Sequence, residues 1–459
     1  MARFALILVA ACLLPACSRT EASLVRAVDA GSNCPNGGVA IESGQDTNGN
    51  GELDDNEVQS TQYVCSAEGI VICNGGVIIT GTTTIESMDD WAKLADVNCV
   101  DGDLIITNTA GTDLIAPDLN IVTGDLIIAG NPNLTSLQGI GQVTAVGGTY
   151  LVQANDALTT LNGVSSLTEA ARLSIVGNSS LVDLAGLEGF ADLHFDLLVE
   201  DNINLASLDG LEKLVDNSRE LLIVSNPNLA SLDALAKLRS VFFLQISGST
   251  ALQSAMLPAL TKVDERVLFN TNTALQSISL PALVTIGDLT QIDDNGALTT
   301  FDAPELRTSG GIAFDRDNTL QSVTMANLLF STAGMTFSSL PELVTIAVPN
   351  LNAVATSLQF SQTPARTNFI GFSGLQTIGG DMIVTSDTTV QDFTGLSMLR
   401  TISGNMTVTS DAALQSFNGL TSLTDIGGSL TISNDAMLPA STAMNFAASV
   451  AVHGMVSIH

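Results

Sequence analysis

The 459-residue chain carries 47 acidic side chains against 15 basic ones, for a net charge of −32, and 4% of its residues are aromatic. This balance argues against nucleic acid as a partner, because phosphate binding needs clustered Lys and Arg, and the sequence contains no such cluster. Its hydrophobic residues, 45% of the total, are mainly Leu, Ile, Val and Ala, which suits an extended core better than a compact enzyme interior.

Residues 1–16 are organised as a secretory signal peptide. Arg3 precedes an apolar run that ends at Leu14 and is too short to span a membrane. The following residues, Leu14-Pro15-Ala16-Cys17, resemble the lipobox of bacterial lipoproteins, which implies cleavage before Cys17 and lipidation of its thiol. By the same resemblance, Ser18 implies an outer-membrane or cell-surface anchor in a Gram-negative bacterium. The alternative is an ordinary secretory signal in which Cys17 is incidental.

Four cysteines remain once Cys12 leaves with the signal and Cys17 is lipidated: Cys34, Cys65, Cys73 and Cys99. An even number of cysteines in an exported protein indicates disulfides, and four allow three connectivities. We favour Cys34 with Cys65 and Cys73 with Cys99, because each pair brackets a distinct segment. A cysteine metal site is disfavoured, since the sequence has no CxxC spacing near these positions.

A short tether is expected over residues 17–33, followed by a disulfide-bracketed segment over 34–66. Within that segment, residues 46–57 match the calcium-loop pattern D-x-[DN]-x-[DN]-G-x5-E. The flanks do not resemble the helices of an EF-hand, so only the loop is compared. The alternative is a solvated Asx-rich turn. The candidate Ca²⁺ ligands are Asp46, Asn48, Asn50, Glu52 through its carbonyl, Asp54 and Glu57.

One repeat unit fills the remainder, residues 70–459. A leucine recurs every 22 to 24 residues from Leu134 to Leu320, and an Asn, Ser or Asp stands three residues before each. Alternating apolar pairs such as Leu126/Ile128 and Leu173/Ile175 lie further upstream in each unit. Such a period is typical of a solenoid, and the alternation predicts one short strand with a buried face per coil. We interpret the Asn position as a turn-former with left-handed backbone, in preference to a ligand-binding stripe.

These units resemble the receptor L-domain family, the leucine-rich modules of insulin- and EGF-type receptors. The resemblance rests on Cys73-Asn74-Gly75-Gly76, on Cys99-Val100-Asp101-Gly102-Asp103-Leu104-Ile105-Ile106, and on the unit Gly-[Asp/Ser]-Leu-x-Ile-x-x-Asn-x-x-Leu. It implies an all-β, right-handed β-helix or leucine-rich-repeat-like solenoid of 23–24-residue coils. Residues 322–369 depart from the period and contain three prolines, which predicts a bend, an insertion or a seam between two halves.

No catalytic constellation was found: G-x-S-x-G, H-E-x-x-H and phosphate-loop motifs are all missing from the sequence. The acidic pairs Asp54-Asp55 and Asp293-Asp294 are interpreted as solvated faces. The sequence therefore predicts a non-enzymatic, lipid-anchored envelope module that recognises or adheres to a protein or glycan. The alternatives are an envelope spacer without a ligand and, less favoured, a polysaccharide-active β-helix enzyme. An exposed apolar patch on one sheet would favour binding, and uniformly polar faces would favour the spacer.

Overall fold

The computed structural model describes residues 5–6, 23–29, 38–45, 47–48, 50, 53–65, 71–73, 75–190, 192–193 and 196–459. The chain divides into two compact units, Met1–Asn74 and Gly75–His459. Within the described residues, no helix has the length and apolar character needed to cross a membrane. Cys17 and Cys34, the expected lipidation site and first disulfide partner, lie outside the described residues.

The N-terminal unit is a four-stranded antiparallel sheet in the order β1-β2-β3-β4. Its strands are β1 (Ala5–Leu6), β2 (Ser23–Asp29), β3 (Gly38–Gln45) and β4 (Val58–Cys65). β3 and β4 form a hairpin, and the calcium-like loop joins them. β2 pairs along its whole length with β3, so the tether prediction is wrong for residues 23–29, whose Leu and Val residues favour a strand.

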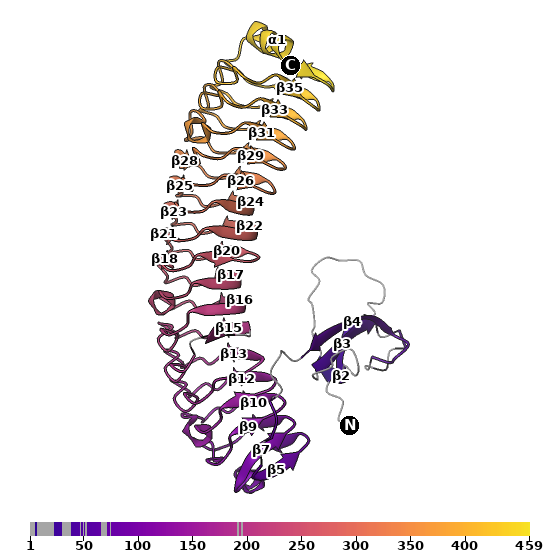
Figure 1. Ribbon diagram of the computed structural model, residues 1–459, viewed down its shortest axis with the longest axis vertical. Helices are drawn as coiled ribbons and strands as arrows, with labels where there is room; N and C mark the ends of the chain where they lie inside the picture. Colours follow the sequence, from indigo (N-terminus) through magenta and orange to yellow (C-terminus); the bar gives the residue numbers. More distant parts are fainter. Residues whose placement is uncertain are drawn as a thin grey trace. The chain divides into compact units, whose positions relative to one another are not determined.

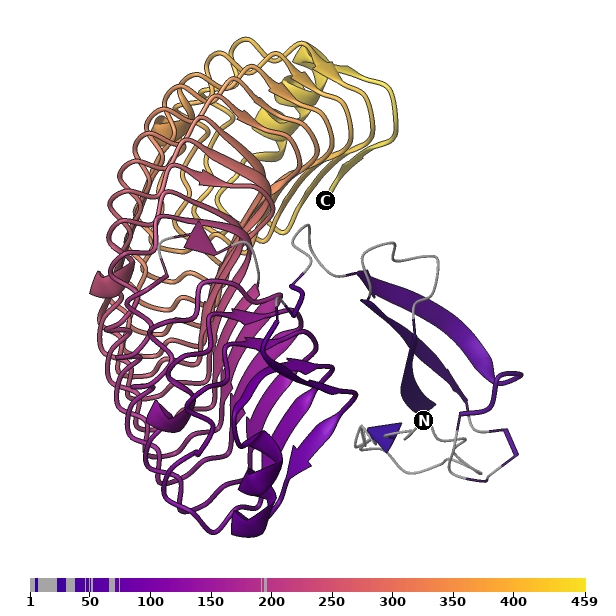
Figure 2. The same ribbon diagram turned by 60° about the horizontal axis from the view of Figure 1, so that its bottom comes forward.

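The second unit is a β-solenoid of about 16 turns with a spacing of about 23 residues, which confirms the predicted fold class (Figure 1). Figure 2 shows the coils wound around one shared interior. Parallel strands from successive coils pair to form a long ladder, in which equivalent residues are 22 apart at Leu104 and Leu126 and 26 apart at Leu430 and Val456. The long ladder consists of β6 (Thr83–Ile85), β8 (Leu104–Thr107), β10 (Leu126–Ala129), β12 (Thr149–Gln153), β13 (Arg172–Val176), β15 (Asp196–Glu200), β16 (Asp216–Val224), β17 (Ser240–Ser247), β20 (Val267–Asn270), β22 (Thr285–Asp293), β24 (Thr308–Asp315), β27 (Met335–Ser338), β30 (Leu358–Ser361), β32 (Met382–Thr385), β34 (Met406–Thr409), β36 (Leu430–Ser433) and β38 (Val456–Ile458).

Shorter strands lie on the other sides of the coil. A ladder preceding the long one contains the N-terminal ends of β16, β17, β22 and β24, and also β14 (Asp192–Leu193), β19 (Lys262–Val263), β26 (Phe330–Ser331), β29 (Ala353–Val354), β31 (Thr377–Ile378), β33 (Thr401–Ile402), β35 (Asp425–Ile426) and β37 (Ala451–Val452). The first coils have β5 (Val77–Thr80), β7 (Val97–Asp101), β9 (Ile121–Val122) and β11 (Ala145–Val146). The middle coils have β18 (Ser254–Met256), β21 (Ser277–Ser279), β23 (Thr300–Asp302), β25 (Ser322–Thr324) and β28 (Thr345–Ala347).

The interior is built by two sequence periods within each coil. The predicted alternating pairs, such as Leu126 and Ile128, are fully buried because alternate strand residues face one side. Beyond the strand, buried residues recur every third position, as at Leu134, Leu137 and Ile140. Short 3-10 turns carry part of this return path: η2 (Met88–Leu94), η3 (Gln138–Ile140), η4 (Asp233–Leu235) and η5 (Ile370–Phe372). The helix α1 (Ala440–Ser449) closes the C-terminal end by burying Ala443 and Phe446.

The corner after each long-ladder strand corrects the interpretation of the Asn position. The left-handed residue is the one before it, for example Ala154 with φ 52° and Asp201 with φ 56°. Asn155 and Asn202 themselves are fully buried and hydrogen-bonded to neighbouring coils. The asparagine is therefore an internal polar ladder, and the turn is made by a residue whose identity varies from coil to coil.

Residues 322–369 also differ from expectation, because the long ladder runs through them without interruption. β24 pairs with β27, β27 with β30, and β30 with β32, in regular register. The departure lies in the side chains. Leu340 occupies the Asn position of its coil, and in the next coil Arg366 occupies the leucine position. The disulfide between Cys73 and Cys99 is present as predicted.

Candidate functional site

Glu57, the last residue of the calcium-like loop, is buried and bonded to the loop itself. Its Oε1 accepts hydrogen bonds from the Thr47 and Asn48 amides at 2.8 and 3.0 Å, and from the Thr47 hydroxyl at 2.8 Å. Its Oε2 accepts from the Asp54 amide at 3.1 Å. These hydrogen bonds hold the pKa of Glu57 below its usual value, and the bond from the Asp54 backbone amide has the largest effect. The carboxylate therefore serves to close the loop.

The other described members of the loop also bond to one another. Asp54 Oδ2 accepts from the side-chain amides of Asn48 and Asn50 at 2.6 and 2.9 Å, and Asn48 Oδ1 accepts from the Asn50 amide at 2.9 Å. Hydrogen bonds of this kind within a loop are typical of an Asx-rich turn. Asp46 and Glu52, the remaining candidate ligands, lie outside the described residues. Over the described part of the chain, no group of three or more His, Cys, Asp or Glu side chains is placed to hold a metal ion.

The outward face of the long ladder carries an aliphatic row in its N-terminal half. Because the strands pair in register, one outward-facing residue of each coil lies beside its equivalent in the next coil. The residues at this position are partly exposed, except Ser174, which is buried. Strand neighbours lie about 4.8 Å apart, so the row extends over roughly 24 Å. In order, the aliphatic row is Ile105, Ile127, Leu151, Ser174, Leu198 and Leu222. Sequence reasoning missed it, because outward aliphatics resemble the inward pairs beside them.

Acidic side chains border the aliphatic row. Asp103 and Asp125 precede it in the first coils, and Asp196 and Glu220 take the same position further on. Asp196 is paired with Arg172 at 2.7 Å and with Arg219 at 3.4 Å. Burial, with Asp103 nearby, raises the pKa of Asp125, and burial beside Asp196 raises that of Glu220. The margin thus holds more carboxylates than basic partners.

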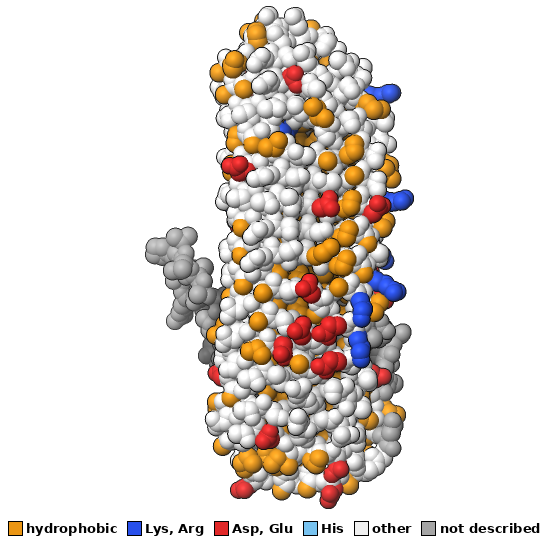
Figure 3. Space-filling model, turned by 90° about the vertical axis from the view of Figure 1, so that its left-hand side faces the viewer, with side chains coloured by type: hydrophobic (Ala, Val, Ile, Leu, Met, Phe, Trp, Pro, Cys, Tyr) orange, Lys and Arg blue, Asp and Glu red, His pale blue; other side chains and the backbone are white. Residues whose placement is uncertain are grey.

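In the C-terminal half the same outward position is mostly polar, and Ala313 and Ile383 are its apolar members. It is held by Gln291, Ala313, Thr336, Gln359, Ile383, Thr407 and Thr431. Figure 3 shows a different face of the solenoid, on which acidic side chains gather toward the lower, N-terminal coils. The apolar strip and many of the visible carboxylates therefore belong to the first half of the solenoid.

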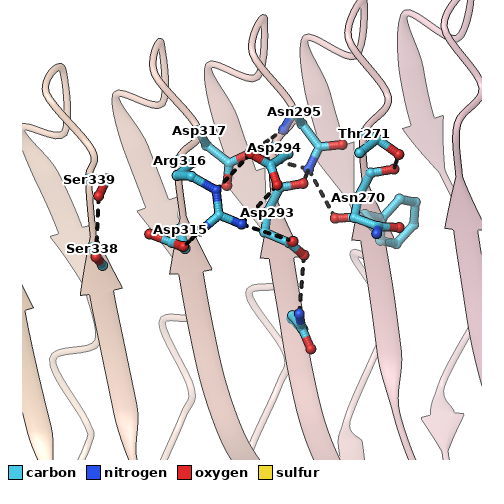
Figure 4. Close-up of polar contacts among 12 residues, drawn as sticks. Asn270, Thr271, Asp293, Asp294, Asn295, Asp315, Arg316, Asp317, Ser338 and Ser339 are labelled. Carbon is cyan, nitrogen blue, oxygen red and sulfur yellow. Dashed lines mark hydrogen bonds and ion pairs between the residues drawn. The ribbon is translucent and has the colours of Figure 1, made fainter. Parts of the chain in front are cut away.

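The pair Asp293-Asp294 forms a charge cluster with the next coil (Figure 4). The Arg316 guanidinium lies 2.8 Å from Asp294 and 3.6 Å from Asp293, and it also contacts Asp315. Burial raises the pKa of Asp293, whereas the hydrogen bond from Arg316 lowers that of Asp294. Since the guanidinium engages all three carboxylates, the cluster is a cross-coil ion network at the strand ends.

Arg366 is a buried charge that the sequence analysis did not single out. It is 3% exposed, its Cζ lies 4.0 Å from the Phe360 ring centre and 4.1 Å from that of Phe369, and it pairs with the fully buried Asp387 at 2.7 Å. A hollow of about 370 Å³ beside it is lined by residues 344–347 and 366–372. The missing leucine in the repeat was the available signal. Because Asp387 neutralises the guanidinium, the pair gives the hollow no net charge.

Among known protein families, a match is found for residues of the N-terminal unit. Residues 23–65 match a family model described as a domain of unknown function (DUF7151), and these residues are β2, β3 and β4 with their connections. None of the curated proteins matches the chain. Among solved structures, the crystal structure of a TLR13-ssRNA13 complex shows 11% identity over 80% of this chain and 89% of that chain, with a TM-score of 0.13. A likeness at that score supports no argument about function.

Proposed function

We propose that the chain is a lipid-anchored envelope module that recognises a protein partner through the aliphatic row of the solenoid. The observation that carries the proposal is the row itself, a partly exposed apolar strip along one sheet of a strongly acidic molecule. Apolar surface aligned along a sheet face is typical of interaction sites, because leaving it in water is unfavourable.

The chemistry of the row favours a protein over a glycan. Apart from the buried Ser174 its side chains are Ile and Leu, with no aromatic ring for a sugar to stack on, and carboxylates border it. A partner surface with apolar side chains flanked by Lys or Arg complements this arrangement. The outward position is mostly polar in the C-terminal half, as a spacer would require, so the spacer function remains the second candidate for that half.

The anchor in this proposal rests on Leu14-Pro15-Ala16-Cys17 alone. Cys17→Ala should release the protein from the membrane fraction and abolish palmitate labelling. Unchanged membrane retention and labelling would exclude the lipid.

Binding is tested by capture from envelope extracts with the delipidated chain. Leu151→Glu and Leu198→Glu place a charge in the row and should remove the captured partner, while Thr407→Glu and Thr431→Glu, at the same position of C-terminal coils, should not. Far-UV spectra of all four variants check folding. Equal capture by both pairs would mean that the row is not the site, and a hit confined to a glycan array would replace the protein partner by a sugar.

A further inference from the structure

The buried ladder at the Asn position changes its chemistry along the solenoid. It runs Thr109, Asn131, Asn155, Asn178, Asn202, Asn226, Ser249, Asn272, Asn295, Asp317, Leu340, Thr363, Asp387, Asp411 and Asp435. The first half is amide, and the second half has carboxyl groups. All of these side chains except Asp435 are buried, and Asp435 is half-buried.

In the amide coils each side chain uses both of its polar atoms. Asn202 Oδ1 accepts from the Asn178 backbone amide at 3.0 Å, and Asn202 Nδ2 donates to the carbonyls of Ile175 and Glu200 at 2.9 and 3.0 Å. Asn155 and Asn272 repeat this pattern, each with Nδ2 2.9 Å from a carbonyl of an earlier strand. In the asparagine coils the side chain therefore supplies an acceptor toward one coil and a donor toward backbone carbonyls.

The aspartates keep the acceptor but lack the donor when ionised. Oδ1 of Asp317 accepts from the Asn295 amide at 2.8 Å, that of Asp411 from Asp387 at 2.7 Å, and that of Asp435 from Asp411 at 2.8 Å. In the described structure, Oδ2 of each of these three aspartates is buried with no hydrogen-bond partner. The equivalent atom of the asparagine coils, Nδ2, donates to backbone carbonyls, so an ionised Oδ2 in the same place would be repelled by those oxygens and poorly solvated.

We propose that Asp317, Asp411 and Asp435 are protonated members of the ladder, whose carboxyl O–H replaces the amide donor of asparagine, so that the second half of the solenoid loosens as pH rises. Asp387 is the exception that supports this assignment. Its Oδ2 accepts from the buried Arg366 guanidinium at 2.7 Å, so it has a counterion and needs no proton.

Neighbouring carboxylates favour the protonated form of Asp317 and Asp411, whereas the Arg366 guanidinium acts in the opposite direction at Asp411. Asp317 faces Asp293 and Asp294, and both of these carboxylates are engaged by Arg316. Asp411 faces two carboxylates, those of Asp387 and Asp435, and the Arg366 guanidinium. Asp435 faces Asp411. Burial is the main cause that raises the pKa of Asp317 and Asp411 to about 7 and that of Asp435 to about 6. A pKa raised by folding stabilises the fold below the unfolded value near 3.9, and that stability is lost as pH rises toward 7.

The test compares the wild type with the triple variant Asp317→Asn, Asp411→Asn, Asp435→Asn, which carries a donor at every pH. A matched control, Asp89→Asn, Asp118→Asn, Asp156→Asn, removes the same charge from exposed positions. Hydrogen–deuterium exchange of the β34 and β36 peptides is followed at pH 5.5, 6.5 and 7.5. For each titrating group, linkage allows the equilibrium constant for local opening to change by up to tenfold per pH unit. By pH 7.5 this constant should be at least tenfold larger in the wild type and the control than in the triple variant.

An infrared spectrum of the wild type gives a readout that does not depend on the variant folding. A protonated-carboxyl band should be present at pH 6 and fade by pH 8. Equal pH profiles for wild type and triple variant, or an infrared spectrum without this band at pH 6, would overturn the assignment.

Discussion

The two halves of the solenoid share one backbone and differ in what fills it. In the first half the inward side chains are mainly Leu, Ile and Val, the buried ladder is Asn, and the outward row is aliphatic. In the second half Phe rings stack from coil to coil, as Phe314, Phe337 and Phe360 do with ring centres 5.7 and 5.3 Å apart, and the outward row is mostly polar. A parallel ladder therefore fixes the coil, while the side-chain positions remain free to take separate roles.

The largest difference between the halves should appear when the ion pair of the second half is broken. Asp387→Asn leaves the Arg366 guanidinium buried without a counterion, which should destabilise the chain by about 3–5 kcal/mol in urea unfolding. The double variant Asp387→Asn, Arg366→Leu recreates the Asn and Leu of the first half. It should lie within about 1 kcal/mol of wild type. A single variant as stable as the double would show that the pair is not needed.

The reverse exchange transfers the chemistry of the second half to the first. Asn202→Asp replaces a donor to the Ile175 and Glu200 carbonyls by an oxygen. The variant should be destabilised by about 2 kcal/mol at pH 8 and less at pH 5.5, because protonation restores a donor. Urea unfolding at the two pH values measures this, with Asn228→Asp, on an exposed amide of the next coil, as control. An effect of equal size at both pH values would contradict the ladder account.

The repeat shows which features of the fold could be predicted from the sequence. The 22- to 24-residue period and the alternating pairs predicted the coil, because buried strand residues must alternate. The turn was misassigned because the left-handed residues, such as Gly130, Ala154 and Asp201, share a backbone conformation but differ in residue type. Residues 322–369 looked irregular because Leu340 and Arg366 break the letter pattern while the backbone pairing continues. The aliphatic row emerged only from the register, which the period does not supply.

The smallest effect on either half is expected from the loop of the N-terminal unit. If the calcium prediction holds, titration calorimetry of the delipidated chain should show one Ca²⁺ site with a dissociation constant on the order of 10⁻⁴ to 10⁻³ M. Glu57→Gln should remove the site and leave the far-UV spectrum of the solenoid unchanged. An absence of heat at millimolar Ca²⁺ would leave the Asx-rich turn as the better description of the loop.

The most direct test of the division between the halves is hydrogen–deuterium exchange of the chain with and without its captured partner. Binding through the aliphatic row predicts added protection in β8, β10, β12, β13, β15 and β16, with β27 to β36 unchanged. Protection centred on β27 to β36, or spread evenly over the solenoid, would contradict it.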